Sequence, residues 1–172
     1  MISSSDILHS KILIVDDQEA SVLLLERILR GAGYVSIAST MDPNEVCELH
    51  RKHRYDLILL DIEMPSGGFS GFQVMEELKK IEQDNQLPVI VITAHPDHKL
   101  HALQAGARDF ISKPFELAEV LARVHNMLEV RLLLMATTYR INALEQKIQE
   151  VEANRDLIRH QLEEVKRLRD QG

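Results

Sequence analysis

The sequence has a single cysteine, Cys47, among its 172 residues, so no disulfide bond can form within the chain. The absence of disulfides is typical of a protein from a reducing compartment. The chain also lacks an apolar run long enough to span a membrane, and its start has neither the basic nor the apolar part of a secretion signal. We therefore expect a cytoplasmic protein that does not enter a membrane.

Basic side chains are fewer than acidic ones, 20 against 27. The formal net charge is −7, and the acidic excess falls within residues 1–128, because residues 129–172 contain as many basic as acidic side chains. A protein that binds nucleic acid through its phosphates presents a basic stripe, and this sequence has none. We therefore expect no direct binding of nucleic acid. With 45% hydrophobic and 27% charged residues, the chain has the composition of an ordinary globular protein.

The sequence contains a regular alternation of two kinds of segment. Strands that alternate with helices favour an α/β fold, here a five-stranded parallel doubly wound sheet with helices on both faces. We assign residues 11–128 to this domain and residues 1–10 to a flexible leader. Apolar runs predict strands at 11–15, 34–38, 56–60, 88–92 and 108–111, and amphipathic stretches predict helices at 18–31, 43–53, 71–82 and 96–105.

The last segment, residues 129–172, differs in its pattern. From Glu116 to Asp170 the chain has neither glycine nor proline, and a helix of this length reaches roughly 80 Å, far beyond a compact domain. Its apolar residues follow a heptad repeat, which predicts a parallel two-stranded coiled coil over 127–169 and hence a homodimer. The a and d positions are Met127, Val130, Leu134, Thr137, Ile141, Leu144, Ile148, Val151, Arg155, Ile158, Leu162 and Val165.

Charged residues beside this seam support the parallel arrangement. Arg140 at a g position can face Glu145 of a partner helix, and Lys147 can face Glu152 in the same way. Arg155 at a core position lowers the stability of the coil and is a candidate for fixing its register. The alternatives are a helix that folds back on its own domain and a single solvated helix, and the strongly apolar seam disfavours the second.

Chemically reactive side chains stand at the ends of the predicted strands. Asp16 and Asp17 close one apolar run and Asp61 closes another, so three carboxylates would meet at one edge of the sheet. Negative charges this close together require a cation between them. A hard cation such as Mg2+ or Mn2+ prefers oxygen ligands. Thr93 and Lys113 end two further runs at the same edge. A carboxylate nucleophile, a metal ion, a hydroxyl and an ammonium group are the parts of a phosphoryl-transfer site.

Each of these residues also has a simpler interpretation. Asp16 and Asp17 could cap a helix, Thr93 could merely end a strand, and Lys113 could be a surface lysine. Together and in this order they form a pattern over residues 11–128 that resembles the receiver domain of bacterial two-component response regulators, the CheY-like family. The matching motifs are Asp16-Asp17, Asp61-Ile-Glu-Met-Pro65, Thr93-Ala94, and Lys113-Pro114 preceded by Phe110.

The resemblance implies a role for each matching residue. Asp61 would accept a phosphoryl group from a phosphohistidine on a sensor histidine kinase or a histidine phosphotransfer protein. Lys113 would pair with that group and the Thr93 hydroxyl would bond to it, after which Thr93 and Phe110 would move inward as the switch. The protein would then be a phosphoacceptor and not an enzyme. The implied metal ligands are Asp17 and Asp61 directly, Asp16 through water, and the backbone carbonyl of Glu63.

The family pattern also marks Glu63 and His95, which lie two residues after Asp61 and Thr93, as positions that tune loss of the phosphoryl group. Lys113-Pro114 is a candidate cis peptide bond. The sequence departs from the family pattern in two ways. The loop from Pro65 to Gly71 is two residues longer than usual, and Phe110 replaces a tyrosine that many relatives have.

Other features of the sequence have more than one interpretation. The histidines at 50 and 53, or at 95, 98 and 101, could bind a metal ion, but solvated helix faces and loops are favoured. The coil could bind partners, or the chain could be the receiver and linker of a longer regulator with an enzymatic output such as cyclic-di-GMP turnover. A haloacid-dehalogenase-like phosphatase is a remote alternative, because that family needs a second aspartate where Glu63 or Gln18 stands.

Overall fold

The computed structural model describes residues 3–65, 70–82 and 87–171. Five parallel strands form one sheet in the order β2-β1-β3-β4-β5. The strands are β1 (Ile12–Val15), β2 (Ile37–Thr40), β3 (Leu57–Asp61), β4 (Val89–Thr93) and β5 (Asp109–Ser112). The helices are α1 (Ser4–Leu8), α2 (Glu19–Gly31), the short 3-10 helix η1 (Pro43–Glu45), α3 (Val46–His53), α4 (Gly71–Ile81), α5 (Asp97–Ala105) and α6 (Leu117–Arg169). The predicted α/β fold with a parallel doubly wound sheet is confirmed.

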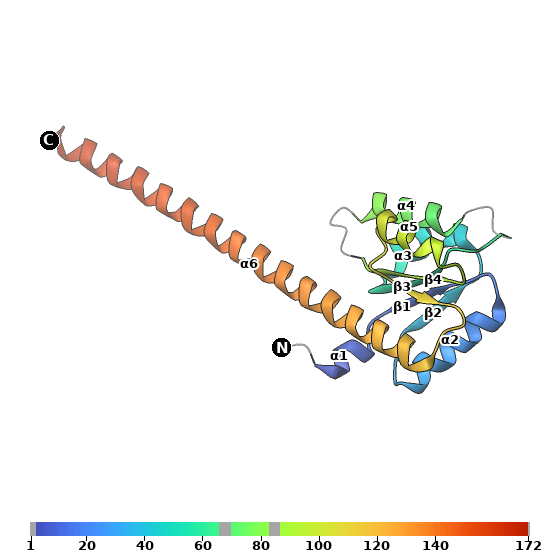
Figure 1. The fold of residues 1–172 in the computed structure, drawn as a ribbon. Helices are drawn as coiled ribbons and strands as arrows, with labels where there is room; N and C mark the ends of the chain where they lie inside the picture. The colour runs from blue at the N-terminus through green and yellow to red at the C-terminus, as the bar shows by residue number, and fades with distance from the viewer. Residues whose placement is uncertain (1–2, 66–69, 83–86, 172) are drawn as a thin grey trace. The chain divides into compact units, whose positions relative to one another are not determined.

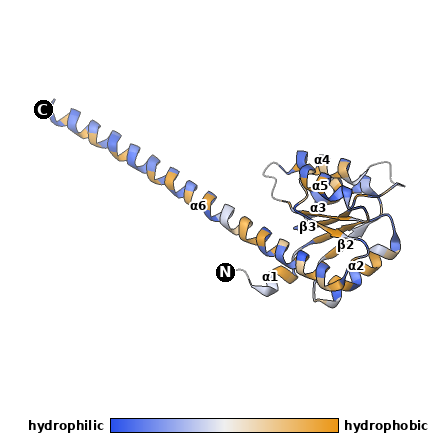
Figure 2. Cartoon of the chain, viewed as in Figure 1, coloured by the Kyte–Doolittle hydropathy of each residue, from blue (hydrophilic) through white to orange (hydrophobic). Residues whose placement is uncertain are grey.

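The sheet is the middle layer of the first of two compact units, residues 1–133 (Figure 1). Every residue of β1, β3 and β4 is buried, because these central strands are covered on both faces. Successive side chains of a strand point to opposite faces, so each strand contributes to two apolar clusters. Ile12 and Ile14 pack with α2 and the first turns of α6, whereas Leu13 and Val15 belong to the cluster that includes α3 and α4. Figure 2 shows the strands as an apolar layer between the helices.

The flexible leader expected at residues 1–10 is corrected for residues 3–10, since residues 1–2 lie outside the described part of the chain. Residues Ser4–Leu8 form α1, whose start is a capping box in which Ser3 and Asp6 bond to each other's backbone N–H groups. Ile7 is buried in the same apolar cluster as β1 and α2, and the carbonyl of Leu8 accepts a hydrogen bond from the backbone N–H of Val35. These contacts are tertiary, so the pattern of residues 1–10 alone could not predict them.

One strand is displaced from its predicted range. The apolar run 34–38 predicted a strand there, but β2 extends over Ile37–Thr40. Tyr34 is buried in the core just after α2, and its backbone N–H donates to the carbonyl of Leu29, so this residue closes the helix. Pairing with β1 then begins at Ile37, which lies opposite Ile12. The predicted helices agree with α2, η1–α3, α4 and α5 to within one residue at each end.

Helix α6 runs without interruption from Leu117 to Arg169. Within the first unit its residues Val120, Val124 and Leu128 are fully buried in the core. The second unit, residues 134–172, is helix throughout its described part. Leu144, Ile148 and the other apolar residues of its seam are more than 40% exposed in the single chain, and Figure 2 shows apolar and polar bands along it. Among the described residues, no helix is long and apolar enough to cross a membrane.

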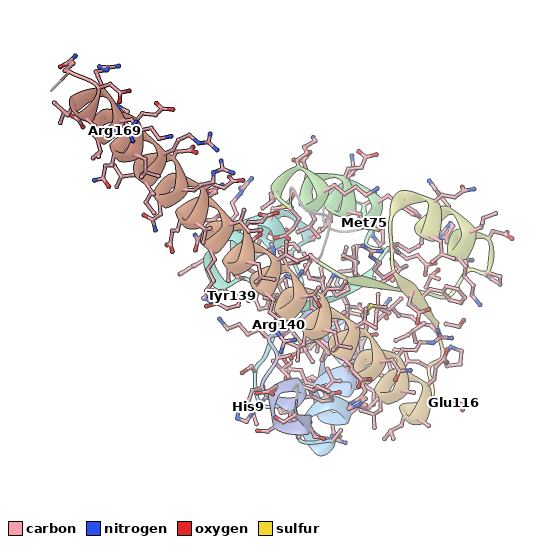
Figure 3. The ribbon with its side chains drawn as sticks, turned by 90° about the vertical axis from the view of Figure 1, so that its left-hand side faces the viewer. His9, Met75, Glu116, Tyr139, Arg140 and Arg169 are labelled. Atoms are coloured by element: carbon pink, nitrogen blue, oxygen red, sulfur yellow. The ribbon has the colours of Figure 1, made fainter. Side chains whose placement is uncertain are left out.

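None of the described residues of the second unit is buried in the single chain. Tyr139 and Arg140 project from the helix, as does Arg169 near its end (Figure 3). By contrast with these exposed side chains, the side chain of Met75 on α4, also labelled in Figure 3, is buried against the sheet. Most of the stability of a helix in a folded protein comes from the packing of its apolar face, and this seam packs against no other part of the described chain.

Candidate functional site

The carboxyl edge of the sheet gathers the reactive side chains. Asp16 follows β1 directly, Asp61 and Thr93 are the last residues of β3 and β4, and Lys113 follows β5. The strand register places them together, because Val15 lies opposite Leu60, Asp61 opposite Ile92, and Thr93 opposite Ser112. In a parallel sheet all carboxyl ends meet at one edge, so residues almost 100 positions apart in the chain become neighbours.

Three carboxylates converge there as the sequence predicted. Asp16, Asp17 and Asp61 each offer an oxygen, and these atoms all lie within 4.8 Å of one another. Asp16 and Asp61 are fully buried, whereas Asp17 is partly exposed. Backbone N–H groups hold the buried pair in place, since Gln18 donates to Asp16 Oδ1 at 2.9 Å and Glu63 donates to Asp61 Oδ1 at 2.9 Å.

The ammonium group of Lys113 joins the two buried acids. Its Nζ donates to Asp61 Oδ2 at 2.7 Å and to Asp16 Oδ2 at 3.0 Å. Burial raises the pKa of Asp61, and the bonds from Lys113 and from the backbone of Glu63 counteract only part of this effect. For Lys113 burial acts to lower the pKa, but the two carboxylates outweigh it and raise the pKa. The Lys113–Pro114 peptide bond is cis, as predicted.

The donor set suits a small, hard divalent cation. Three carboxylates face one another with one ammonium between two of them, so the site holds more negative than positive charge. Carboxylate oxygens are the ligands of Mg2+, and no histidine or cysteine belongs to the cluster. The residues present therefore fit the predicted Mg2+ or Mn2+.

Thr93 is bonded to the neighbouring loop. Its hydroxyl donates to Glu63 Oε1 at 2.7 Å and accepts a hydrogen bond from the backbone N–H of His95 at 3.0 Å. Glu63 Oε2 also accepts from the backbone N–H of Ala94 at 3.3 Å. His95 Nε2 lies 3.8 Å from Glu63 Oε1. The structure thus brings together Thr93, Glu63 and His95, the three residues that the sequence placed at the rim of the site.

Sequence reasoning missed His98 as a member of this group. Its Nδ1 lies 3.3 Å from Glu63 Oε1, closer than His95, and its ring meets the ring of Phe72 edge-on at 6.2 Å between centroids. The spacing of His95 and His98 could have drawn attention to the pair. It could not have indicated the contact with Glu63, because that contact depends on the tertiary packing of β3 beside β4.

Phe110 lies in β5 and is partly buried. Two cations cover its ring, with Lys99 Nζ 4.8 Å and Arg123 Cζ 5.5 Å from the ring centroid. Arg123 also donates to both carboxylate oxygens of Asp109 at 2.7 Å. Phe110, the predicted switch residue, therefore lies under the charged side chains of Lys99 and Arg123. The identity of residue 110 alone could not predict these neighbours.

The remaining histidines show no metal cluster among the described residues. His50 departs from the expected solvated position because it is only 1% exposed. Its Nδ1 accepts a hydrogen bond from the backbone N–H of Tyr55, so its Nε2 carries the proton and donates to Glu82 Oε1 at 2.8 Å. His101 stacks on Phe72 at 4.1 Å. The longer loop after Pro65 includes residues 66–69, which lie outside the described part of the chain.

Fold and site together define a phosphoacceptor domain of the receiver class. The family model of the response regulator receiver domain matches residues 12–125, and the chain belongs to this family. Response regulator PleD of Caulobacter vibrioides is 35% identical over 129 residues, which cover 74% of this chain and 28% of PleD. Transcriptional regulatory protein PrrA of Mycobacterium tuberculosis is 38% identical over 123 residues, 70% of this chain and 51% of PrrA.

Solved structures agree with this assignment. The receiver domain of NtrX from Brucella abortus superposes with a TM-score of 0.64 at 29% identity, covering 69% of this chain and 98% of that domain. Chemotaxis protein CheY4 of Vibrio cholerae gives a TM-score of 0.63 at 26% identity and the same coverage. The chain spans about half or less of the length of the curated relatives it matches.

Proposed function

We propose that Asp61 is the phosphoacceptor of a response regulator receiver and that it takes its phosphoryl group from a histidine kinase or a histidine phosphotransfer protein. The observation that carries this proposal is the ammonium of Lys113, which lies 2.7 Å from Asp61 Oδ2 beside the carboxylates of Asp16 and Asp17. A buried carboxylate with one cationic partner and an adjacent hard-metal site has the nucleophile and the charge compensation that phosphoryl transfer needs.

Each residue of the site has a distinct role in the proposed transfer. An oxygen of Asp61 forms a bond to phosphorus while the bond from phosphorus to the donor histidine breaks. Lys113 stays beside the new acyl phosphate as a hydrogen-bond donor, and the Thr93 hydroxyl supplies a second donor once it turns from Glu63. Asp17 and Asp61, with Asp16 through water and the backbone carbonyl of Glu63, would hold Mg2+. When bound, this ion would neutralise negative charge on the phosphoryl oxygens.

Acetyl phosphate provides a direct test. Incubation with Mg2+ should add one phosphoryl group to the protein, measured as intact mass, and peptide mapping after borohydride reduction should locate it at Asp61. Asp61→Asn should take up no phosphoryl group, whereas Asp42→Asn, a change at an acid outside the cluster, should behave like the wild type. Labelling at another residue, or multiple turnovers of p-nitrophenyl phosphate, would contradict the proposal and would favour a phosphatase.

The second unit suggests how the signal leaves the receiver. We infer that residues 127–169 form a parallel coiled coil with a second copy of the chain. The supporting observations are the exposed seam, with Leu144 60% and Val151 67% exposed in the single chain, and the charges at 140, 145, 147 and 152. Because α6 contains buried receiver residues such as Val124 and continues as this coil, phosphorylation would alter dimer geometry or strength.

The output beyond the coil has two candidates. The coil itself can bind a partner protein, or it can link the receiver to a further domain, for which cyclic-di-GMP turnover is one possible activity. The relatives favour a further domain, since the chain covers only 28% of PleD and 51% of PrrA. Both candidates require that phosphorylation changes the dimer. The mass of the oligomer with and without beryllofluoride and Mg2+ tests this requirement, because beryllofluoride mimics the phosphoryl group on Asp61.

A further inference from the structure

The hydroxyl of Thr93 has a single proton, so its possible acceptors exclude one another. In this structure the short contact is to Glu63 Oε1 at 2.7 Å, and the backbone carbonyl of His95 lies further away at 3.3 Å. A hydroxyl can donate to one acceptor at a time, so Thr93 cannot donate to a phosphoryl group on Asp61 while Glu63 holds its proton. Whatever fixes Glu63 against Thr93 therefore stabilises the unphosphorylated arrangement relative to the phosphorylated one.

Glu63 is fixed by several groups. Ala94 donates its backbone N–H to Oε2 at 3.3 Å, and His98 Nδ1 lies 3.3 Å from Oε1, the same oxygen that accepts from Thr93. Burial opposes ionisation of Glu63, but the hydrogen bonds from Thr93 and Ala94, with His95 and His98 nearby, lower the pKa of Glu63. His98 Nδ1 approaches Oε1 at 3.3 Å as a close polar contact without hydrogen-bond geometry, and it is the contact that this carboxylate makes with α5.

His98 is itself held by an element outside the phosphorylation site. It lies in the first turn of α5, and its ring packs edge-on against Phe72 at the start of α4. His101, one turn further along α5, stacks on the same phenylalanine at 4.1 Å. The side chain of His98 thus connects the α4–α5 surface to the carboxylate that binds Thr93.

We propose that His98 is a positioning residue of the switch, which holds Glu63 against Thr93 and so keeps the Thr93 hydroxyl away from the phosphoryl position. The inference rests on the proposed role of Asp61 as phosphoacceptor. Loss of the His98 side chain frees Glu63 to leave Thr93 and makes the phosphorylated arrangement easier to reach. A partner that displaces His98 by binding over Phe72 would act on the switch in the same direction.

Beryllofluoride binding in the presence of Mg2+, measured by calorimetry on the full chain, tests the proposal. His98→Ala should bind about three- to tenfold more tightly than the wild type, as expected for loss of one polar contact of ordinary strength. His98→Asn should restore wild-type affinity, because the amide nitrogen of asparagine can occupy the position of Nδ1. His125→Ala, at an exposed histidine of α6 outside this cluster, is the matched control and should not change the affinity.

The Thr93→Val background distinguishes this route from a direct electrostatic effect of His98. Without the hydroxyl, His98→Ala should have no further effect on beryllofluoride affinity. Unchanged or weaker binding by His98→Ala, or the same gain in the Thr93→Val background, would overturn the proposal. If the wild type binds beryllofluoride and is labelled at Asp61 but His98→Ala does not differ from it, only this inference fails. If the wild type does neither, the proposed function fails as well.

Discussion

Lys113 donates one hydrogen bond to Asp61 at 2.7 Å and another to Asp16 at 3.0 Å, so a single ammonium compensates two fully buried carboxylates. Lys113→Ala should therefore lower the free energy of unfolding by about 3 kcal/mol, because it leaves buried charge without its partner. Mg2+ should restore part of this loss, since a divalent ion in the acidic cluster replaces the missing positive charge. Urea denaturation with and without Mg2+ measures both effects.

Lys80→Ala provides the control for this prediction. Lys80 forms an ion pair with Glu77 that is just as short, at 2.6 Å, but it lies on the exposed surface of α4. Exposed pairs contribute little to stability, so Lys80→Ala should leave the denaturation curve almost unchanged and insensitive to Mg2+. A Lys113→Ala protein as stable as the wild type would contradict the central role of this lysine.

Asp61 should make stability depend on pH in the acidic range. Because burial raises its pKa in the folded protein above the ordinary value of 3.8, the folded state keeps a proton that the unfolded chain releases. Stability should therefore fall as the pH rises from about 4 through the raised pKa, and the loss should be complete above it. Asp61→Asn should remove this part of the slope and raise Tm at neutral pH by about 2–4 °C for each kcal/mol gained.

Thermal unfolding of wild type and Asp61→Asn between about pH 4 and pH 7, without divalent cations, measures the difference. The two curves should come closest at the acidic end, where Asp61 is protonated in the folded state and about half protonated in the unfolded chain, whose ordinary pKa is 3.8. A Tm of Asp61→Asn below that of the wild type at neutral pH would show that the ion pair with Lys113 outweighs the effect of burial.

Asp17 should be needed for metal binding. Asp17→Asn should weaken Mg2+ binding by at least about tenfold, because one of three converging carboxylates loses its charge. Calorimetry is the suitable measurement, since the chain contains no tryptophan to report binding by fluorescence. Asp42→Asn, at the cap of η1, should bind Mg2+ like the wild type. Equal affinities for wild type and Asp17→Asn would place the ion elsewhere.

Gly71 stands where α4 begins against the end of β3. A Cβ added there would lie 2.5 Å from Ile62 Cα and 2.7 Å from the carbonyl oxygen of Asp61, distances that backbone atoms cannot accommodate. Gly71→Ala should reduce stability by about 1–3 kcal/mol and should also weaken Mg2+ binding, because the backbone that carries Asp61 must shift. Gly31→Ala, with open space around the added carbon, should be neutral or slightly stabilising.

Leu144 tests the proposed coiled coil. Leu144→Lys places a charge in the centre of the apolar seam and should convert a dimer to a monomer, with the receiver's thermal unfolding retained. Sedimentation or light scattering gives the mass. Tyr139→Lys is the control, since Tyr139 is 77% exposed and lies at an f position, away from the seam (Figure 3). A monomeric wild type, or a dimer that survives Leu144→Lys, would contradict the arrangement.

Much of the site could be predicted because strand ends are easy to recognise. A buried parallel strand is a short apolar run, so the acids after residues 15 and 60, Thr93 and Lys113 could all be assigned to one edge. The α1 helix could not be predicted, since its stability comes from the contact of Ile7 with the distant core. His50 was likewise expected in solvent, because its buried position depends on contacts with Tyr55 and Glu82 that the local sequence does not show.

By itself, the sequence determined the order of strands and helices, the residues at the carboxyl ends of the strands and the heptad repeat after residue 127. These features depend on periodicity and on the identity of single residues, which are local properties of the chain. Only the tertiary structure decided that Lys113 binds both Asp16 and Asp61, and that Glu63 takes the proton of Thr93 beside His98. Such contacts join separate strands and loops, so their partners are fixed by packing across the sheet.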